Sequence, residues 1–262
     1  MHLLSQINPL YSLSGLVVGV LVGLTGVGGG SLMTPLLVLL FGIHPSTAVG
    51  TDLLYAAATK SVGTAVHGWK RTVQWSIVVR LAAGSVPTTI LTLWILAQQG
   101  KQSASVNAMI TTALGWALIV TAVAILFRKA IVAYVLSRTK ELEPGRATGL
   151  TILLGATLGV LVALTSVGAG ALGMTVLLIL YPKMDVAKLV GSDIAHAVPL
   201  TLLAGIGHWM MGSVNWTLLA SLLVGSIPGI ILGSLLAART PDGVLRPVLA
   251  GTLALVGGKL LT

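Results

Sequence analysis

Two acidic residues, Asp52 and Asp193, lie in apolar stretches and end matching tetrapeptides, "VGTD" (49–52) and "VGSD" (190–193). A charge in apolar surroundings is costly unless it is paired, so such residues usually have a role. They could carry a proton or a cation, or gate a path. The alternative is that both cap the N-termini of helices, since Asp is a favoured capping residue.

Two further ionisable residues accompany these acids. Lys60 follows Asp52 by eight residues, about 80° around a helix of 3.6 residues per turn. It could attract an anion, pair with Asp52, or extend its ammonium to an interface. His196 follows Asp193 by three residues and is a candidate proton relay, with a hydrogen-bonded core histidine as the alternative.

Glycine-rich stretches interrupt two apolar runs, "TGVGGGS" (25–31) and "TSVGAGA" (165–171). A helix that restarts there, for example near Ser31, offers free N–H groups and a positive dipole end to an anion. Alternatively, glycine only allows close helix packing, which is our interpretation of Gly15, Gly19 and Gly23. The expected substrate-binding residues are Thr25, Gly26, Gly28, Gly29, Gly30, Ser31, Thr51, Lys60, Thr165, Ser166, Gly168, Gly170 and Ser192, and the expected coupling or gating residues are Asp52, Asp193 and His196.

The composition indicates an integral membrane protein. Of 262 residues, 55% are hydrophobic and 8% charged, against about 25% charged in soluble domains, and mean hydropathy is +1.01. The net charge of +9 therefore does not indicate a nucleic-acid partner. The absence of cysteine excludes disulfides and thiolate metal sites. No removable signal peptide is predicted, and neither a cofactor nor a metal site is expected.

The elements that position these residues are predicted to be helices, since lipid leaves backbone polar groups no other partner. We expect an all-α polytopic protein with eight apolar segments, the first and fifth broken at their glycines. The segments are 13–41, 47–66, 75–97, 105–127, 149–181, 186–207, 214–238 and 243–261. The polar stretch 128–148 is expected to be a basic cytoplasmic linker, partly helical up to Glu143.

The chain contains an internal duplication. At an offset of 140, residues 19–32 match residues 159–172 at ten of fourteen positions. At an offset of 141, His67 matches His208, and the Val-x-Trp at 73–75 matches that at 214–216. Shared apolar composition alone would not match His and Trp. We therefore expect two homologous repeats, 13–127 and 149–261, an architecture typical of secondary transporters.

The basic residues favour an inverted arrangement of these repeats. Four full crossings per repeat would place eight loop Lys and Arg inside and five outside. If the first segment of each repeat is re-entrant, the counts become eleven and two. The positive-inside rule weakly favours the second arrangement. His67 and His208, beside Trp residues at segment ends, are predicted to be interfacial anchors, and Arg80 could also reach an interface.

The glycine pattern resembles a family signature. G-x3-G-x3-G-L-x-G-x-G-G-G-x4-P, from Gly15 to Pro35, recurs in degenerate form at 155–170 and resembles the TauE/SafE family of sulfite exporters and anion permeases. The resemblance covers about residues 13–260. It implies a multi-pass bacterial plasma-membrane transporter of sulfite, sulfonates or related anions. Family members commonly carry Thr-Ser where this chain has Thr51–Asp52 and Ser192–Asp193.

The function expected from these features is secondary transport of a small anion, such as sulfite, an organosulfonate, or a related oxyanion or carboxylate, across the inner membrane. A proton or ion gradient would drive it. A passive channel or divalent metal-ion permease remains the alternative, and an enzyme is not expected, because the polar groups come in near-symmetric pairs. The expected partners are the anion, the lipid bilayer and a proton or cation co-substrate, with a homodimer left open.

Overall fold

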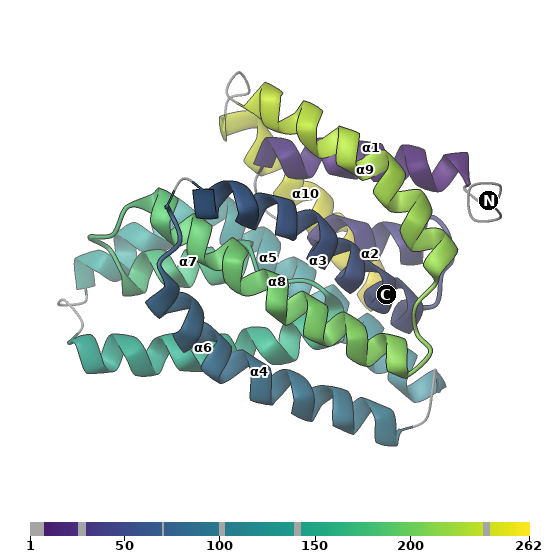
Figure 1. Cartoon of the computed structure of the whole chain (residues 1–262), viewed down its shortest axis with the longest axis horizontal. Coiled ribbons are helices and arrows are strands. Elements are labelled where there is room, and N and C mark those ends of the chain that lie inside the picture. The colour runs from purple at the N-terminus through teal and green to yellow at the C-terminus, as the bar shows by residue number, and fades with distance from the viewer. Residues whose placement is uncertain (1–7, 26–29, 70, 100–102, 139–142, 238–241) are drawn as a thin grey trace.

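Helices account for all the secondary structure of the described residues in this computed structural model (Figure 1). The structure describes residues 8–25, 30–69, 71–99, 103–138, 143–237 and 242–262. The helices of these residues are α1 (Pro9–Thr25), α2 (Gly30–Leu39), α3 (Pro45–Trp69), α4 (Trp75–Gln98), α5 (Ala104–Arg138), α6 (Pro144–Thr165), α7 (Ala171–Leu180), α8 (Val186–Met210), α9 (Trp216–Ala237) and α10 (Asp242–Leu261).

Local chemistry explains where several helices begin. Proline is the first residue of α1, α3 and α6. It fits the first helical turn because its missing N–H would have no intrahelical partner there. Residues 128–138 continue α5, so the first part of the stretch expected to be a linker is helical.

The helix ends gather at two opposite ends of the molecule. At one, the Gln74 N–H donates to Ser192 Oγ (2.8 Å), which joins the start of α4 to the start of α8. At the other, the Asn215 N–H donates to Thr51 Oγ1 (3.1 Å), which joins the start of α9 to that of α3. We call these the Gln74 end and the Asn215 end.

Two helix pairs pack with their backbones in close contact, α1 with α9 and α4 with α6 (Figure 1). A Cβ added at Gly15 would lie 2.3 Å from the Leu222 carbonyl oxygen. One added at Gly155 would lie 2.1 Å from that of Leu81. Glycine is required at these positions because any side chain would push the helices apart.

Two other helix pairs, α3 with α8 and α5 with α10, run antiparallel. In the first pair, Gly205 lies against Leu54, near the start of α3, whereas Gly191 lies against Thr72, just beyond its end. In the second, Gly115 of α5 lies against Leu261 at the end of α10. The long α3 and α8 cross the middle of the molecule in Figure 1.

Helices α6 and α7 form a hairpin. The Tyr181 hydroxyl, just after α7, lies 2.7 Å from Thr151 Oγ1 near the start of α6. Closer to the tip, a Cβ on Gly173 would lie 3.2 Å from the Leu158 side chain. The chain therefore returns to the Gln74 end after entering the molecule, and residues 166–170 form the tip inside it.

The outer surface is apolar, as a lipid-facing surface requires. Five helices of the described residues are long and apolar enough to cross a membrane: α4, α5, α6, α8 and α9. Trp75 and Trp94 are 63% and 60% exposed at opposite ends of α4. Nineteen residues separate them, about 28 Å at 1.5 Å per residue, close to the roughly 30 Å of a hydrocarbon core.

Candidate functional site

The hairpin tip contains a glycine whose backbone conformation is one that residues with side chains rarely adopt. After α6 ends at Thr165, Ser166 has φ 60° and Gly168 has φ 117°. The Thr165 hydroxyl accepts a hydrogen bond from the Val167 N–H (3.1 Å). The Gly168 carbonyl accepts two, from the N–H groups of Gly170 (2.9 Å) and Gly173 (3.2 Å). These bonds fix the turn that starts α7.

Two N–H groups of the tip have no hydrogen-bond partner among the described residues. Within the described part of the chain, the N–H groups of Gly168 and Ala169 make no hydrogen bond, although both residues are buried. The first turn of α7, beginning at Ala171, adds N–H groups that have no intrahelical partner. This arrangement can accept an oxyanion or a carboxylate.

The two acids lie close to this tip, in the interior of long helices. Asp193 is buried on α8, and its Oδ1 would lie 2.7 Å from a Cβ on Gly173 in the first turn of α7. Asp52 is buried on α3, where the Thr34 hydroxyl donates to its Oδ2. Ser166 of the tip lies beside Asp52. One oxygen of each carboxylate, Oδ1, has no partner among the described residues.

Capping does not explain these acids. Asp52 lies in the second turn of α3, which begins at Pro45, and Asp193 lies in the second turn of α8, which begins at Val186. The residue at the N-cap of α8 is Asp185. The capping alternative was therefore wrong, because a cap must precede the first turn.

Lys60 is the cation that the acids share. It is half-buried on α3 and attracts both Asp193 and Asp52 electrostatically. Arg128 of α5 also attracts Asp193. The cluster of Asp52, Lys60 and Asp193 thus combines two carboxylates from α3 and α8 with one ammonium. We call it the ionic cluster.

Histidine and tyrosine occupy matching places beside the ionic cluster. His196 is buried, and its Nε2 lies 2.8 Å from Ser85 Oγ on α4, whereas its Nδ1 has no partner among the described residues. Tyr55, 141 positions earlier, is also buried and faces Ser226 of α9. The Tyr55 and Ser226 hydroxyls do not reach hydrogen-bonding geometry.

Not every predicted site residue reaches the ionic cluster. The hydroxyls of Thr51 and Ser192 bind backbone N–H groups at opposite ends of the molecule. Thr25 ends α1, while Gly30 and Ser31 begin α2; the side chains of Thr25 and Ser31 are not described. Gly26, Gly28 and Gly29 lie outside the described residues.

His208 corrects another expectation. It is 1% exposed, and its Nε2 lies 2.9 Å from the Ala163 carbonyl oxygen. The interfacial interpretation was therefore wrong for His208. This carbonyl is free to accept because the Val167 N–H, its ordinary helical partner, is bound by Thr165. The side chain of His67 is not described.

Three contributors to the site were missed in the sequence: Thr34, Ser85 and Gly173. Gly173 is the extra residue that changes the repeat offset from 140 to 141, since Met33–Thr34 then matches Met174–Thr175. The change of offset indicated that the chain after the second glycine-rich stretch has one residue more than the chain after the first. Among the described residues, no three His, Cys, Asp or Glu side chains are grouped as a metal site would require.

Comparison with known proteins identifies the family. The sequence model of the sulfite exporter TauE/SafE family matches residues 11–260. The chain belongs to the TauE/SafE family. The probable membrane transporter protein YjnA of Bacillus subtilis is 41% identical over 220 residues, covering 81% of this chain and 83% of YjnA. This TauE/SafE protein is therefore a membrane transporter.

A second relative of this TauE/SafE chain is more distant. The probable membrane transporter protein YdhB of Bacillus subtilis is 28% identical over 214 residues, which cover 79% of this chain and 81% of YdhB. No solved structure matches the chain. The membership of the TauE/SafE family that the glycine pattern predicted is thus confirmed.

Proposed function

We propose that this TauE/SafE transporter moves a small anion across the bacterial inner membrane, coupled to a proton gradient. The anion would be sulfite, an organosulfonate, or a related oxyanion or carboxylate. The observation that carries the proposal is the position of Lys60. It is attracted to a carboxylate from α3 and another from α8, and Asp193 packs on the first turn of α7.

The anion would bind between the hairpin tip and Lys60. The free N–H groups of Gly168 and Ala169, with the start of α7, would hold its oxygens. Lys60 would supply the balancing charge. A hydrogen bond to a charged group contributes about 1.5–3 kcal/mol, so Lys60→Gln should raise the KM for the anion by about tenfold or more.

Proton coupling would follow from competition for Lys60. The ammonium attracts two carboxylates, with Arg128 near one of them and His196 close by. When either carboxylate takes a proton, Lys60 loses one competitor and can pair with the anion. An anion and a proton would therefore cross together.

The membrane arrangement we propose is a pair of inverted halves. Helices α3 and α8, at matching places in the two repeats, run antiparallel, as do α5 and α10. The contact of Gly15 with Leu222 recurs as that of Gly155 with Leu81, at offsets of 140 and 141. Such recurrence supports a two-fold axis in the membrane plane. The Gln74 end would face the cytoplasm.

The proposal is tested with purified protein in liposomes, using sulfite as the probe. An inward proton gradient should drive sulfite accumulation by the parent protein. Asp52→Asn and Asp193→Asn should each abolish gradient-driven accumulation while preserving sulfite counterflow, because the amide cannot carry the proton. Accumulation at the parent level in both variants would overturn coupling at these carboxylates.

A matched acid controls for a general loss of charge. Glu143 is exposed at the N-cap of α6, away from the ionic cluster. Glu143→Gln removes the same charge outside the ionic cluster and should leave gradient-driven accumulation unchanged. If no sulfite counterflow occurs in any variant, then sulfite is the wrong anion, and an organosulfonate or carboxylate replaces it in the same assay.

A further inference from the structure

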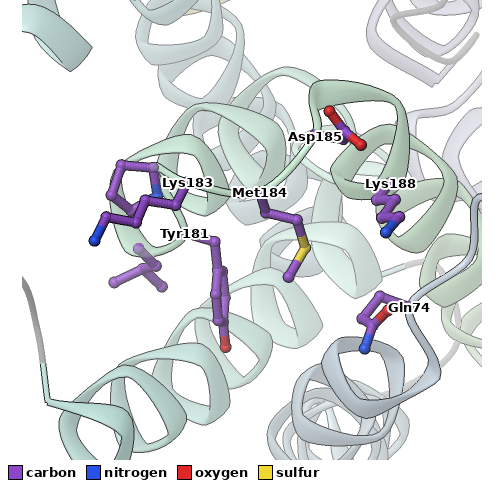
Figure 2. Close-up of a pocket in the computed structure, with 8 residues that line it drawn as sticks. Gln74, Tyr181, Lys183, Met184, Asp185 and Lys188 are labelled. Carbon is purple, nitrogen blue, oxygen red and sulfur yellow. The ribbon is translucent and has the colours of Figure 1, made fainter.

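A surface cavity opens at the Gln74 end, between the base of the hairpin and the starts of α4 and α8. Its volume is about 530 Å³. Residues from three places line it: Gln74 before α4, the 181–185 connection after α7, and Lys188 in the first turn of α8. Figure 2 shows the Lys188 and Gln74 side chains on one side of the cavity and the Tyr181 ring on the other, with Met184 between them.

The charges around the cavity are mostly positive. Lys188 and Lys183 line it, with Lys183 on the far side of the Tyr181 ring (Figure 2). Asp185 also lines the cavity and lies above Lys188 in that view. A third cation lies behind the wall, since Arg80 Nη1 donates to the Tyr181 hydroxyl (3.2 Å). Cations on several sides of one cavity attract small anions.

The Tyr181 wall is fixed by its hydrogen bonds. The Thr151 hydroxyl donates to the Ala147 carbonyl oxygen (2.7 Å), so its own hydrogen is used. The 2.7 Å contact between Tyr181 and Thr151 must therefore use the tyrosine hydrogen. With Arg80 donating to the same hydroxyl, Tyr181 is held from two helices. The cavity wall is a fixed feature of the fold.

The cavity and the ionic cluster are neighbours along α8. Ser192 of α8 accepts the Gln74 N–H and donates to the Lys188 carbonyl (2.7 Å). It thus ties together two residues that line the cavity. The next residue is Asp193, whose carboxylate lies on α7 in the interior. An anion in the cavity is therefore separated from the ionic cluster by about one turn of α8.

The Asn215 end lacks these cations at matching positions. The bond from Asn215 to Thr51 matches that from Gln74 to Ser192, 141 positions apart. At the same offset, however, Lys183 and Lys188 correspond to Gly42 and Thr47. The two lysines that line the cavity thus have no lysine counterparts at the Asn215 end, and they do not follow from the duplication itself.

We propose that this cavity is an anion vestibule, in which Lys188 and Gln74 hold the transported anion before it reaches the ionic cluster. This inference rests on the proposed anion transport. The ligand class is a small oxyanion, such as sulfite or an organosulfonate. The vestibule collects anions from the compartment that faces the Gln74 end, which in the inverted arrangement is the cytoplasm.

The chain has no cysteine, so one introduced thiol can report the local potential. In Met184→Cys, the thiol is modified with an anionic sulfonatoethyl or a cationic trimethylammonioethyl methanethiosulfonate. Ile43→Cys is the control, because it is the matching position at the Asn215 end and is similarly half-buried. We expect the anionic-to-cationic rate ratio to be severalfold higher at 184 than at 43.

Lys188→Gln tests the source of that preference. One unit charge about 6 Å away in water changes each rate about threefold, in opposite directions, so the ratio at 184 should fall about tenfold. Lys129→Gln, on the exposed part of α5, removes the same charge and should leave the ratio unchanged. Millimolar ethanesulfonate, a sulfonate that does not attack the thiosulfonate reagents, should slow the modification at 184 but not at 43.

The outcomes distinguish a failure of the vestibule proposal from a failure of the transport proposal. Equal rate ratios at 184 and 43, a ratio that Lys188→Gln does not lower, or modification at 184 that ethanesulfonate does not slow would each overturn the vestibule. Protection at 184 without flux of sulfite, an organosulfonate or a carboxylate in liposomes would instead overturn the transport proposal. Where flux occurs, Lys188→Gln should raise the KM for sulfite severalfold with kcat unchanged, and only when sulfite is presented to the Gln74 end.

Discussion

At the scale of single residues, the hairpin tip contains a glycine in a conformation that strains other residues. Gly168 has φ 117°, which side-chain-bearing residues rarely adopt. Gly168→Ala should destabilise the protein by about 1–3 kcal/mol. Thermal unfolding in detergent should show a midpoint several degrees lower for Gly168→Ala than for Gly149→Ala on α6, where an added Cβ meets nothing within 4 Å. Equal midpoints would contradict the strain argument.

His208 provides a second test at this scale. Its Nε2 lies 2.9 Å from the Ala163 carbonyl, which is buried at the end of α6. His208→Phe should leave that carbonyl without a partner, at a cost of about 1–3 kcal/mol. His208→Gln retains a donor and should recover part of the stability. The thermal midpoints should therefore follow the order parent, Gln, Phe, and a Phe variant as stable as the parent would exclude this bond as a stabilising contact.

At the scale of elements, α4 packs on α6 with backbone against backbone. Gly155→Ala would place a methyl 2.1 Å from the Leu81 carbonyl oxygen, so one helix must shift. Gly251→Ala, on α10, meets nothing within 4 Å and should gain up to about 1 kcal/mol of helix propensity. Detergent-solubilised Gly155→Ala should unfold below the parent and Gly251→Ala at or above it. Matching shifts in the two variants would argue against the packing explanation.

The sequence predicted where helices begin and end better than it predicted whether consecutive helices continue in one direction or reverse. Apolar runs and prolines place helix boundaries, and the expected break in 149–181 appears as the end of α6 at Thr165 and the start of α7 at Ala171. Whether the chain continues or reverses at such a break depends on contacts between residues far apart, such as Tyr181 with Thr151. The offset change at Gly173 marked a local difference but not its consequence for Asp193.

The candidate site was predictable in part for the same reason. Unusual residues in apolar segments, such as Asp52 and Asp193, stand out in any sequence because burying them is costly. Ordinary residues that complete the site, such as Thr34, do not stand out, since buried threonines are common in this chain. His208 was misjudged because a residue near a helix end can still face inward, against the end of α6.

At the scale of the whole molecule, the two ends should be reached from opposite sides of the membrane. His44, before α3, lies at the Asn215 end, and Lys183, before α8, lies at the Gln74 end. In intact cells, a membrane-impermeant maleimide should modify His44→Cys. Lys183→Cys should react only after permeabilisation. Modification of Lys183→Cys in intact cells would contradict a cytoplasmic Gln74 end.

The glycine contacts also determine which parts of the protein can move independently. Gly15 and Gly19 hold α1 against α9, and Gly155 and Gly159 hold α6 against α4, in each case with backbone on backbone. Each pair joins helices from different halves of the sequence, and neither can slide without a steric clash. We therefore expect these mixed pairs to move as rigid bodies in a transport cycle. Their relative rocking would shear the α3–α8 interface, where opening and closing would alternately expose Asp52 and Asp193.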